Sequence, residues 1–252
     1  MSEDPRYHIK IEPGQVGRYV LMPGDRDRVP RIAAHLDGAR LVAENREYRT
    51  MTGTLDGVPV SVVSSGMGAP CITIGLEELR TAGVDTIIRI GTTGAVAPGP
   101  QRGDSIVALG AVRTEATSRA YIDLEYPAVA DLDVVNALRD ACRAAGAPHH
   151  VGIVESSDAY YAGAWLGAQA EARSERLRRA GLLAIEMEAS ALFVVGRLHG
   201  LRTGCILTLR EEMRPDGARL QAGPAFEAGL DRSIVIAVDA VRRLIRLDAA
   251  RS

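Results

Sequence analysis

Three short segments of the chain place glycine, arginine, threonine and glutamate where they could bind an oxyanion or a sugar. In the first, residues 22–28 (MPGDRDR), Gly24 lacks a Cβ, so an anion could approach the backbone N–H. The helix predicted after it would add unpaired N–H groups, and the planar guanidinium of Arg28 fits two oxygens of a phosphate. A solvated turn with charged side chains is the alternative.

The second segment, residues 89–95 (RIGTTGA), is interpreted as a glycine-rich turn after a strand. Arg89 lies in an apolar run, and a buried guanidinium needs an anionic partner because an unpaired buried charge is costly. That partner could be a bound phosphate or a carboxylate of the core. Thr92 and Thr93 add hydroxyl donors, but the spacing matches neither a dinucleotide fingerprint nor a Walker A loop.

The third segment, Glu186-Met187-Glu188, lies where a predicted strand passes into a predicted helix. A carboxylate can accept hydrogen bonds from two vicinal sugar hydroxyls, and a methionine offers a furanose ring an apolar face. A carboxylate that favours the helix macrodipole is the alternative. For Arg46, in the segment ENREY, a solvated strand edge is the simpler interpretation when that residue is taken alone.

Short apolar runs alternate with longer amphipathic runs over nearly the whole chain. The predicted strands are residues 19–22, 58–64, 86–90, 105–112, 150–154, 183–185 and 203–209. The predicted helices are residues 26–35, 69–81, 131–145, 165–180, 188–199 and 224–247. This alternation predicts an α/β fold in a single domain over residues 1–252, around a mixed or parallel sheet, with a frayed end after residue 247. In such sheets ligands bind where strands end and helices begin.

The composition excludes several classes of protein. Of 252 residues, 46% are hydrophobic and 25% are charged, as in soluble globular domains. The formal charge of -2 and the lack of a basic stripe argue against a nucleic-acid partner. No apolar run is long enough to span a membrane, and the polar N-terminus lacks a secretory signal. The three distant cysteines suggest neither a disulfide framework nor a zinc site, so we expect a cytoplasmic protein.

Several motifs occur together in the order and spacing of one family, namely PGDRDRV, NREY, SSGMGAP, RIGTTGA, SSDAYY and IEMEAS. From His8 to about Arg243 the chain resembles the nucleoside phosphorylase-I family, and within it the uridine phosphorylase branch. The resemblance implies a three-layer α/β/α fold around a mixed, barrel-like sheet. It also implies a hexamer, built as a trimer of dimers, in which two subunits share each active site.

The reaction implied by this resemblance is phosphate-dependent cleavage of the N-glycosidic bond of a ribonucleoside, with a nucleoside and phosphate as partners and no cofactor. The implied catalytic residues are Arg89, Thr92 and Glu188. The implied phosphate ligands are Gly24, Arg28, Arg89 and Thr92, with Arg46 arriving from the partner subunit. The implied ribose ligands are Glu186, Met187 and Glu188, with His8 from the partner subunit at the 5′-hydroxyl. The implied neighbours of the base are Thr93, Gly94, Tyr160 and the strand 203–210.

The base site departs from the pattern of the branch. Uridine phosphorylases of this branch clamp the uracil edge with a glutamine and an arginine, and the matching positions here are Ala164 and Leu166. Because each lost donor costs about 1–3 kcal/mol in a buried site, we expect uracil to bind poorly. The aspartate of the bacterial purine branch corresponds to Thr208, although a slip of one or two residues would bring Arg210 or Glu211 into the pocket. We expect an atypical or modified base, with a purine as one alternative.

Aromatic and metal-binding candidates add little to this interpretation. Tyr160, Tyr161 and Trp165 could form a platform for a flat ring, or they could pack as a lid. Some uridine phosphorylases bind a monovalent cation with a glutamate and a serine. Glu47 matches that glutamate, but Cys71 replaces the serine, and a thiol is a poor ligand for a hard cation. We therefore expect no metal.

Two other functions fit parts of the sequence. A nucleosidase of the same fold would use water in place of phosphate, but such relatives usually lack an arginine set like Arg28, Arg46 and Arg89. A non-catalytic nucleoside-binding protein would fit the altered base contacts. The absence of a dinucleotide fingerprint argues against a nucleotide-dependent oxidoreductase.

Overall fold

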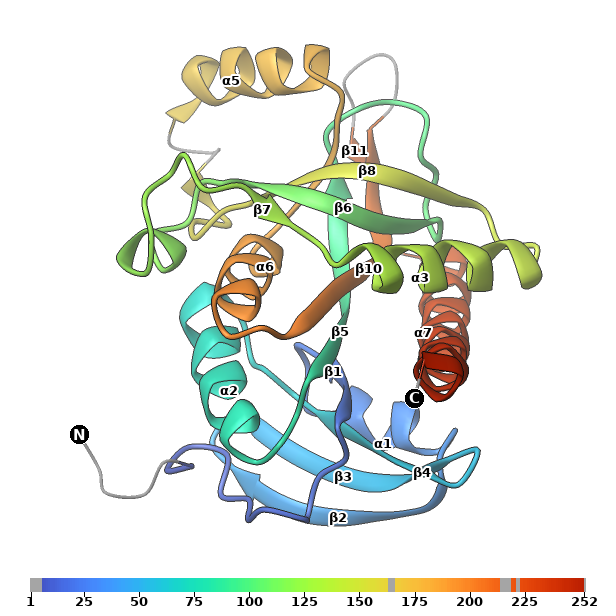
Figure 1. Ribbon diagram of the computed structural model, residues 1–252. Coiled ribbons are helices and arrows are strands. Elements are labelled where there is room, and N and C mark those ends of the chain that lie inside the picture. The colour runs from blue at the N-terminus through green and yellow to red at the C-terminus, as the bar shows by residue number, and fades with distance from the viewer. Residues whose placement is uncertain (1–5, 163–165, 214–218, 221–222, 252) are drawn as a thin grey trace.

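The computed structural model describes residues 6–162, 166–213, 219–220 and 223–251, and strands and helices alternate along them (Figure 1). The strands are β1 (Tyr19–Pro23), β2 (Asp37–Asn45), β3 (Tyr48–Leu55), β4 (Val58–Val63), β5 (Thr86–Ala95), β6 (Ser105–Arg113), β7 (Ala128–Val129), β8 (His149–Ser156), β9 (Leu182–Glu186), β10 (Arg202–Met213) and β11 (Arg219–Leu220). The helices are α1 (Arg28–Ala33), α2 (Ala69–Thr81), α3 (Leu132–Ala144), α5 (Ala168–Arg179), α6 (Ala189–Leu198) and α7 (Pro224–Arg251), with a 3-10 turn η1 (Ser118–Ala120). Within the described ranges, no helix combines the length and the apolar character that a membrane crossing requires.

One mixed sheet carries these strands in the order β11-β10-β6-β8-β9-β5-β1-β4-β3-β2, with β7 against β6. Because β10 also pairs with β5, the strands β10, β6, β8, β9 and β5 close into a barrel-like ring. The strands β1, β4, β3 and β2 extend outward from β5 as an open wing, at the bottom of Figure 1. β5 pairs in parallel with β1 and β10 but antiparallel with β9. The predicted α/β fold with a mixed, barrel-like sheet is confirmed.

Helices cover the sheet from both sides. In Figure 1, α2 and α6 lie on one side of β5 and β10, and α3 and α7 lie on the other. The strands between these layers are buried on both faces, as the segments YVLM of β1 and TIIRI of β5 show, and such strands need continuous apolar runs. Helix α6 is buried along ASALFVVG, which has no charged residue. Helix α5 has no buried residue and lies at the surface.

The prediction that residues 89–95 form a turn is wrong, because this segment lies inside β5. β10 pairs with β5 as far as Gly94, and β9 pairs with Gly94 and Ala95, so the strand continues through both glycines. Gly91 is needed for close packing: a Cβ there would lie 2.7 Å from Cδ2 of Leu207 and 2.9 Å from Nη2 of Arg89. Gly91 therefore allows the side chains of Leu207 and Arg89 to approach the strand closely.

The prediction of a frayed C-terminal end is also wrong for the described residues. Helix α7 continues to Arg251. Asp248 accepts hydrogen bonds from Nη1 of Arg202 at 2.8 Å and from the hydroxyl of Tyr19 at 2.5 Å. These contacts tie the last turns of α7 to β10 and β1. The β2–β3 hairpin and the short strands β7 and β11 were not predicted; β2 is largely exposed and lacks a continuous apolar run.

Candidate active site

The candidate site lies where the two edges of β5 differ. β10 pairs with β5 up to Gly94. On the opposite edge β1 pairs with residues 86–90, and β9 pairs with Gly94 and Ala95. Within the described chain, residues 91–93 have no strand partner on that edge. We call this interruption, residues 91–93, the β5 gap. The glycine turn that follows β1 and the acidic segment at the end of β9 lie on either side of this gap. A crevice where the neighbours of a strand change in this way is a common ligand site in α/β sheets.

Arg89 is a buried guanidinium directed into this crevice. Only 4% of the residue is exposed. Its Nη2 donates to a carboxylate oxygen of Glu188, and its Nε lies 3.4 Å from Oε2 of Glu186. Burial alone would lower the pKa of Arg89, but the charges of Glu188 and Glu186 outweigh burial and raise its pKa above the ordinary value. Arg89 is therefore a permanent cation.

One side of the Arg89 guanidinium is unused by the protein. Its Nη1 is buried and has no hydrogen-bond partner among the described residues. Nη1 lies on the side of Gly24, where an added Cβ would come within 3.8 Å of it. Buried polar groups are almost always satisfied, and a guanidinium binds oxyanions through charge-assisted hydrogen bonds. The unsatisfied Nη1 beside a glycine therefore makes this place a candidate oxyanion site.

Arg28 and Thr92 lie at the same crevice. Arg28 begins α1 immediately after the glycine turn, and its Nε lies 3.9 Å from Oδ2 of Asp25. Burial lowers the pKa of Arg28, the charge of Asp25 partly offsets this effect, and the like charge of Arg89 adds to the lowering. A bound anion would relieve the repulsion between the two arginines. Thr92 is half-buried at the centre of the β5 gap.

Glu186 binds the N-terminal end of helix α6 and so holds that end in place beside Arg89. Its carboxylate accepts the backbone N–H groups of Glu188 and Ala189, each at 2.9 Å, and the hydroxyl of Ser156 at 2.5 Å. Burial raises the pKa of Glu186, the charge of Arg89 opposes that rise, and the like charge of Glu188 adds to it. The helix-terminal role considered for this acidic segment thus belongs to Glu186. Ser156 is a supporting residue that the sequence did not indicate.

Glu188 presents its carboxylate to the crevice from the N-cap position of α6. The residue is 4% exposed. Its Oε1 accepts the backbone N–H of Gly68 at 2.6 Å, and its Oε2 accepts from Arg89. Each carboxylate oxygen retains a further lone pair, which two neighbouring sugar hydroxyls could use. Met187 beside it is half-buried. Gly68, with φ of 89°, belongs to the SSGMGAP turn whose contact with Glu188 the sequence could not show.

The candidate base contacts lie further along β5 and β10. Thr93 is buried and donates its hydroxyl to the carbonyl of Ile185 at 2.6 Å. Gly94 pairs with Ile185 on one edge and with Glu211 on the other. Thr208 donates its hydroxyl to Ser233 of α7 at 2.9 Å, inside the core. The contact of Thr208 with the base stays a prediction.

A bulge in β10 determines which residue near the end of this strand stands opposite Gly94. The register shifts between Leu209 and Glu211, so Glu211, and not Arg210, stands opposite Gly94. The hydroxyl of Tyr160 donates to Oε1 of Glu211 at 3.4 Å. Bulges often re-aim a side chain near active sites, and the entry of Arg210 or Glu211 into the base pocket stays a prediction.

Of the loop after β8, only part is described. Tyr160 and Tyr161 are exposed and meet edge to face, with ring centroids 4.9 Å apart. Leu166 is half exposed, with 51% of its surface accessible. Ala164 and Trp165 lie outside the described residues, so the predictions for them are untested.

His8 is joined through Asn45 to the hairpin that carries Arg46, and we call the surface formed by His8 and Arg46 the His8–Arg46 edge. Asn45 donates its side-chain amide to the carbonyl of His8 at 2.8 Å, and Arg46 follows Asn45 in the β2–β3 hairpin. Arg46 is exposed with φ of 53°, and its own carbonyl accepts from Arg26 at 2.6 Å. Nδ1 of His8 lies 2.6 Å from a carboxylate oxygen of Glu78. The structure thus pairs the two residues that the resemblance assigns to a partner subunit.

Comparison with known proteins supports one family over almost the whole chain. A uridine phosphorylase of Thermococcus kodakarensis is 42% identical over 254 residues, covering 98% of this chain and 89% of that protein. A guanosine phosphorylase of Halorubrum lacusprofundi is 39% identical, covering 98% and 97%. The crystal structure of uridine phosphorylase from Vibrio fischeri ES114 has a TM-score of 0.85 and 32% identity, covering 96% and 99%. The model of the phosphorylase superfamily matches residues 18–246. With motifs, fold and matched length in agreement, this chain belongs to the phosphorylase superfamily.

Proposed function

We propose that this protein is a nucleoside phosphorylase, a pentosyltransferase that moves the ribosyl group of a nucleoside from its base to inorganic phosphate. Arg89 carries this proposal, because one guanidinium faces the glycine turn and also binds Glu188. An oxyanion and a sugar diol bound to these two groups would be immediate neighbours. The uridine and guanosine phosphorylases among the relatives support the same reaction type.

The reaction follows from the charges around the crevice. Phosphate held by Gly24, Arg28, Arg89 and Thr92 would lie beside C1′ of the sugar, which removes most of the entropy cost of a bimolecular step. A phosphate oxygen forms a bond to C1′ while the C1′–N bond breaks, and the base leaves with the electron pair. Positive charge that develops on the sugar in such glycosyl transfers is stabilised by the phosphate anion. Glu188 holds the hydroxyls remote from the breaking bond, where binding energy can favour distortion of the ring. No cofactor takes part in this proposal.

Dependence on phosphate tests the reaction type. Purified protein is incubated with guanosine, inosine or uridine, with and without inorganic phosphate, and released base and ribose 1-phosphate are quantified. We expect base release only with phosphate, because phosphate is the acceptor of the ribosyl group. Equal release without phosphate would identify a nucleosidase, and nucleoside binding without release would identify a non-catalytic binding protein.

The same nucleoside panel tests base preference. Leu166 offers no side-chain hydrogen bond at a position where the uridine branch uses an arginine, whereas Glu211 places a carboxylate beside Gly94 and Tyr160. The charge of Glu211, together with burial, raises the pKa of Tyr160, so this hydroxyl stays neutral. A carboxylate favours a base edge that carries two adjacent N–H donors, such as the N1–H and N2–H₂ edge of guanine. We expect kcat/KM for guanosine to exceed that for uridine by at least about tenfold; uridine as the best substrate would contradict this preference.

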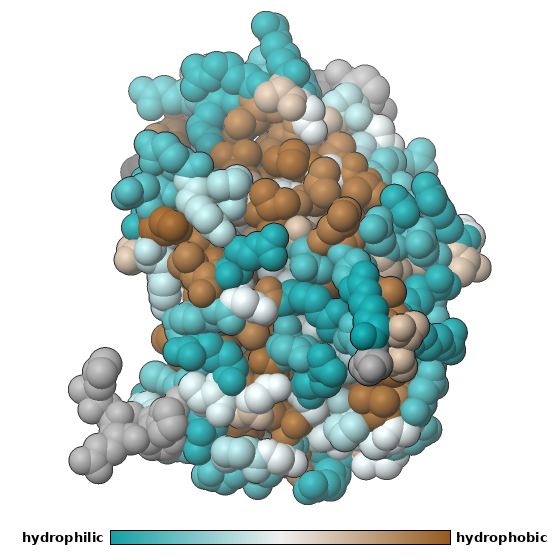
Figure 2. Space-filling model, in the orientation of Figure 1, coloured by the Kyte–Doolittle hydropathy of each residue, from teal (hydrophilic) through white to brown (hydrophobic). Residues whose placement is uncertain are grey.

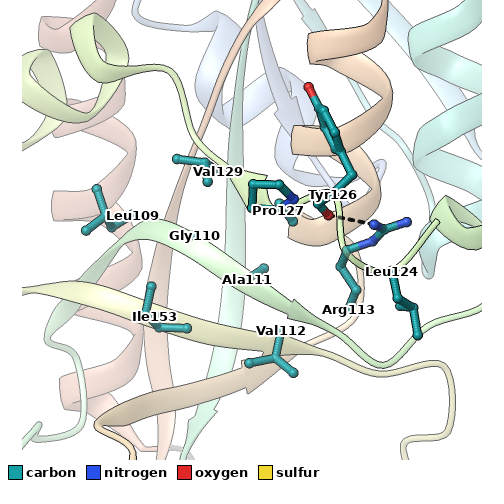
Figure 3. A pocket seen from close by; sticks show the side chains of 11 residues that line it. Leu109, Gly110, Ala111, Val112, Arg113, Leu124, Tyr126, Pro127, Val129 and Ile153 are labelled. Atoms are coloured by element: carbon teal, nitrogen blue, oxygen red, sulfur yellow. Dashed lines mark hydrogen bonds between the residues drawn. The ribbon is translucent and has the colours of Figure 1, made fainter. Parts of the chain in front are cut away.

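We also propose a homo-oligomer, a hexamer, with shared sites. A groove of about 690 Å³ lies between β6, β7 and β8, and Figure 2 shows an apolar surface in this upper region of the molecule. Figure 3 shows Leu109, Val129 and Ile153 around this groove, with Arg113 bonded to the carbonyl of Tyr126 at its far end. Large exposed apolar patches mark interaction surfaces. The His8–Arg46 edge and this groove are two distinct surfaces, as a closed assembly larger than a dimer requires.

Mixing of two inactive variants tests the shared site. Arg46→Ala and Arg89→Ala subunits are co-expressed with different tags, and the mixed assemblies are assayed. A mixed dimer has one site with both defects and one intact site, because each site takes Arg89 from one subunit and Arg46 from the other. Random pairing makes half of the dimers mixed, so about a quarter of the wild-type activity should return. Activity no higher than that of the separate variants would show that each subunit uses its own Arg46.

A further inference from the structure

Glu78 of α2 is a buried carboxylate that belongs to none of the site segments. The residue is 7% exposed. Burying a carboxylate is costly unless hydrogen bonds satisfy it, and the partners of Glu78 come from one place in the chain. Its oxygens accept the backbone N–H groups of His8 at 2.9 Å and of Ile9 at 2.8 Å, and one of them lies 2.6 Å from Nδ1 of His8.

The contact with Glu78 determines which nitrogen of the His8 ring donates a hydrogen bond and which one can accept one. An ionised carboxylate has no hydrogen to donate, so the hydrogen of the contact belongs to Nδ1. In the neutral imidazole Nε2 then carries a lone pair and is an acceptor. The side chain of His8 is 33% exposed. Since Glu78 occupies Nδ1, Nε2 is the ring nitrogen that can bind a ligand.

Two further contacts fix the position of His8. Asn45 binds its carbonyl at 2.8 Å, which joins the N-terminal segment to the hairpin that carries Arg46. Tyr7 meets the His8 ring edge-on, with centroids 5.0 Å apart and planes at 89°. The backbone N–H, the carbonyl and the ring of His8 are thus each held, and Asn45 links His8 to the hairpin that carries Arg46.

From these contacts we infer that Glu78 is a positioning residue: it orients His8 so that Nε2 accepts a hydrogen bond from the ribose 5′-hydroxyl in the site of the neighbouring subunit. The inference rests on the proposed function, in which the His8–Arg46 edge completes that site. A sugar hydroxyl carries a hydrogen that it can donate to the lone pair of a neutral imidazole nitrogen such as Nε2 of His8. Arg46 would meet the phosphate on one side of the sugar while His8 meets the 5′-hydroxyl on the other.

The experiment compares nucleosides that differ only at the 5′-position. kcat/KM is measured for guanosine and uridine and for their 5′-deoxy analogues, with wild-type protein, Glu78→Gln, His8→Ala and the double variant. We expect Glu78→Gln to lower kcat/KM for the 5′-hydroxyl substrates by about 5- to 30-fold, as for the loss of one well-placed hydrogen bond, and to change that for the 5′-deoxy substrates by less than about twofold. In the His8→Ala background, Glu78→Gln should not change further the ratio of kcat/KM for the 5′-hydroxyl substrate to that for its 5′-deoxy analogue.

The neighbouring Glu77 provides a matched control. It lies in the same helix and binds Nε2 of His199 at 2.8 Å, so it forms a second carboxylate–histidine pair without contact to His8. Glu77→Gln should leave the 5′-hydroxyl to 5′-deoxy ratio unchanged. Glu78→Asp, which keeps the charge but shortens the reach, should give an intermediate ratio and covers the case in which the glutamine variant does not fold.

The outcomes separate this inference from the proposed function. Equal losses on both substrate types in Glu78→Gln, or a further loss in the His8→Ala background, would show a purely structural role and overturn the inference. Equal kcat/KM of the wild-type protein for nucleosides with and without the 5′-hydroxyl would also overturn the inference, while leaving the nucleoside phosphorylase proposal intact. Absence of phosphorolysis with every nucleoside would overturn the proposed function itself.

Discussion

Replacement of Arg89 by methionine is expected to lower kcat/KM for phosphorolysis by at least about 10³-fold. The variant removes the Nη1 group beside Gly24 and the cation that would hold phosphate next to the sugar. It also leaves Glu186 and Glu188 buried without their counter-charge. An uncompensated buried charge costs about 3–5 kcal/mol, so the free energy of unfolding should fall as well. Kinetics at varied phosphate and urea denaturation measure the two effects.

Arg202→Met provides the control for Arg89→Met. Arg202 is also an arginine of the central sheet, and it binds Asp248 at the end of α7, away from the β5 gap. The Arg202 variant should lose stability but keep its kcat/KM per folded molecule. If Arg89→Met retained the wild-type KM for phosphate and the wild-type kcat, the oxyanion site would have to lie elsewhere.

The second large effect is expected from Glu188→Gln. Glutamine keeps the shape of the side chain and can still accept the N–H of Gly68, but it removes the charge that pairs with Arg89. Hydrogen bonds to a charged group contribute about 1.5–3 kcal/mol each, so loss of the charge at two sugar hydroxyls should lower kcat/KM by about 10²- to 10³-fold. With 2′-deoxyribonucleosides the loss should be smaller, because one of the two hydroxyls is absent. Steady-state kinetics with matched ribo- and deoxyribonucleosides measure the difference.

Glu155→Gln is the matched control for this variant. Glu155 is another buried carboxylate, paired with Arg173 and with the hydroxyl of Thr114 outside the crevice. Its replacement should not distinguish the two sugars. An equal loss with ribo- and deoxyribonucleosides in Glu188→Gln would contradict the binding of a vicinal diol.

The elements that position the site could be predicted where apolar periodicity is strong. The apolar runs of β1, β5 and α6 predict these elements, because buried strands and helices need continuous or nearly continuous apolar residues. The anionic partner required by Arg89 was also predictable, since a guanidinium within TIIRIG cannot stay unpaired. The sequence left phosphate and a core carboxylate as alternatives. The structure shows the carboxylates of Glu186 and Glu188 on one side and an unsatisfied Nη1 on the other.

What could not be predicted depends on pairing between distant residues. The two glycines of the RIGTTGA segment predict a turn, whereas β10, more than 100 residues away in the sequence, pairs with this segment and holds it extended. The contact of Glu78 with His8 spans 70 residues. The bulge that brings Glu211 opposite Gly94 depends on how β10 pairs with β5. It could therefore not be predicted from the sequence of β10 alone. Tyr160 and Leu166, two of the proposed base contacts, follow β8 in a connecting segment, and such segments vary more in sequence than the strands and helices they join.

The β5 gap has a consequence for how such an enzyme can diversify. Residues 91–93 separate the last partner in β1 from the first in β9, a span of about 10 Å at 3.3 Å per residue. Adding or deleting one residue there would displace the nucleophile from the anomeric carbon by a bond-breaking distance and turn every following side chain to the opposite face. The base contacts that we propose, by contrast, lie after β8 and near the end of β10. Selection can therefore alter which heterocycle departs while the length of three strand residues keeps the reacting atoms in place.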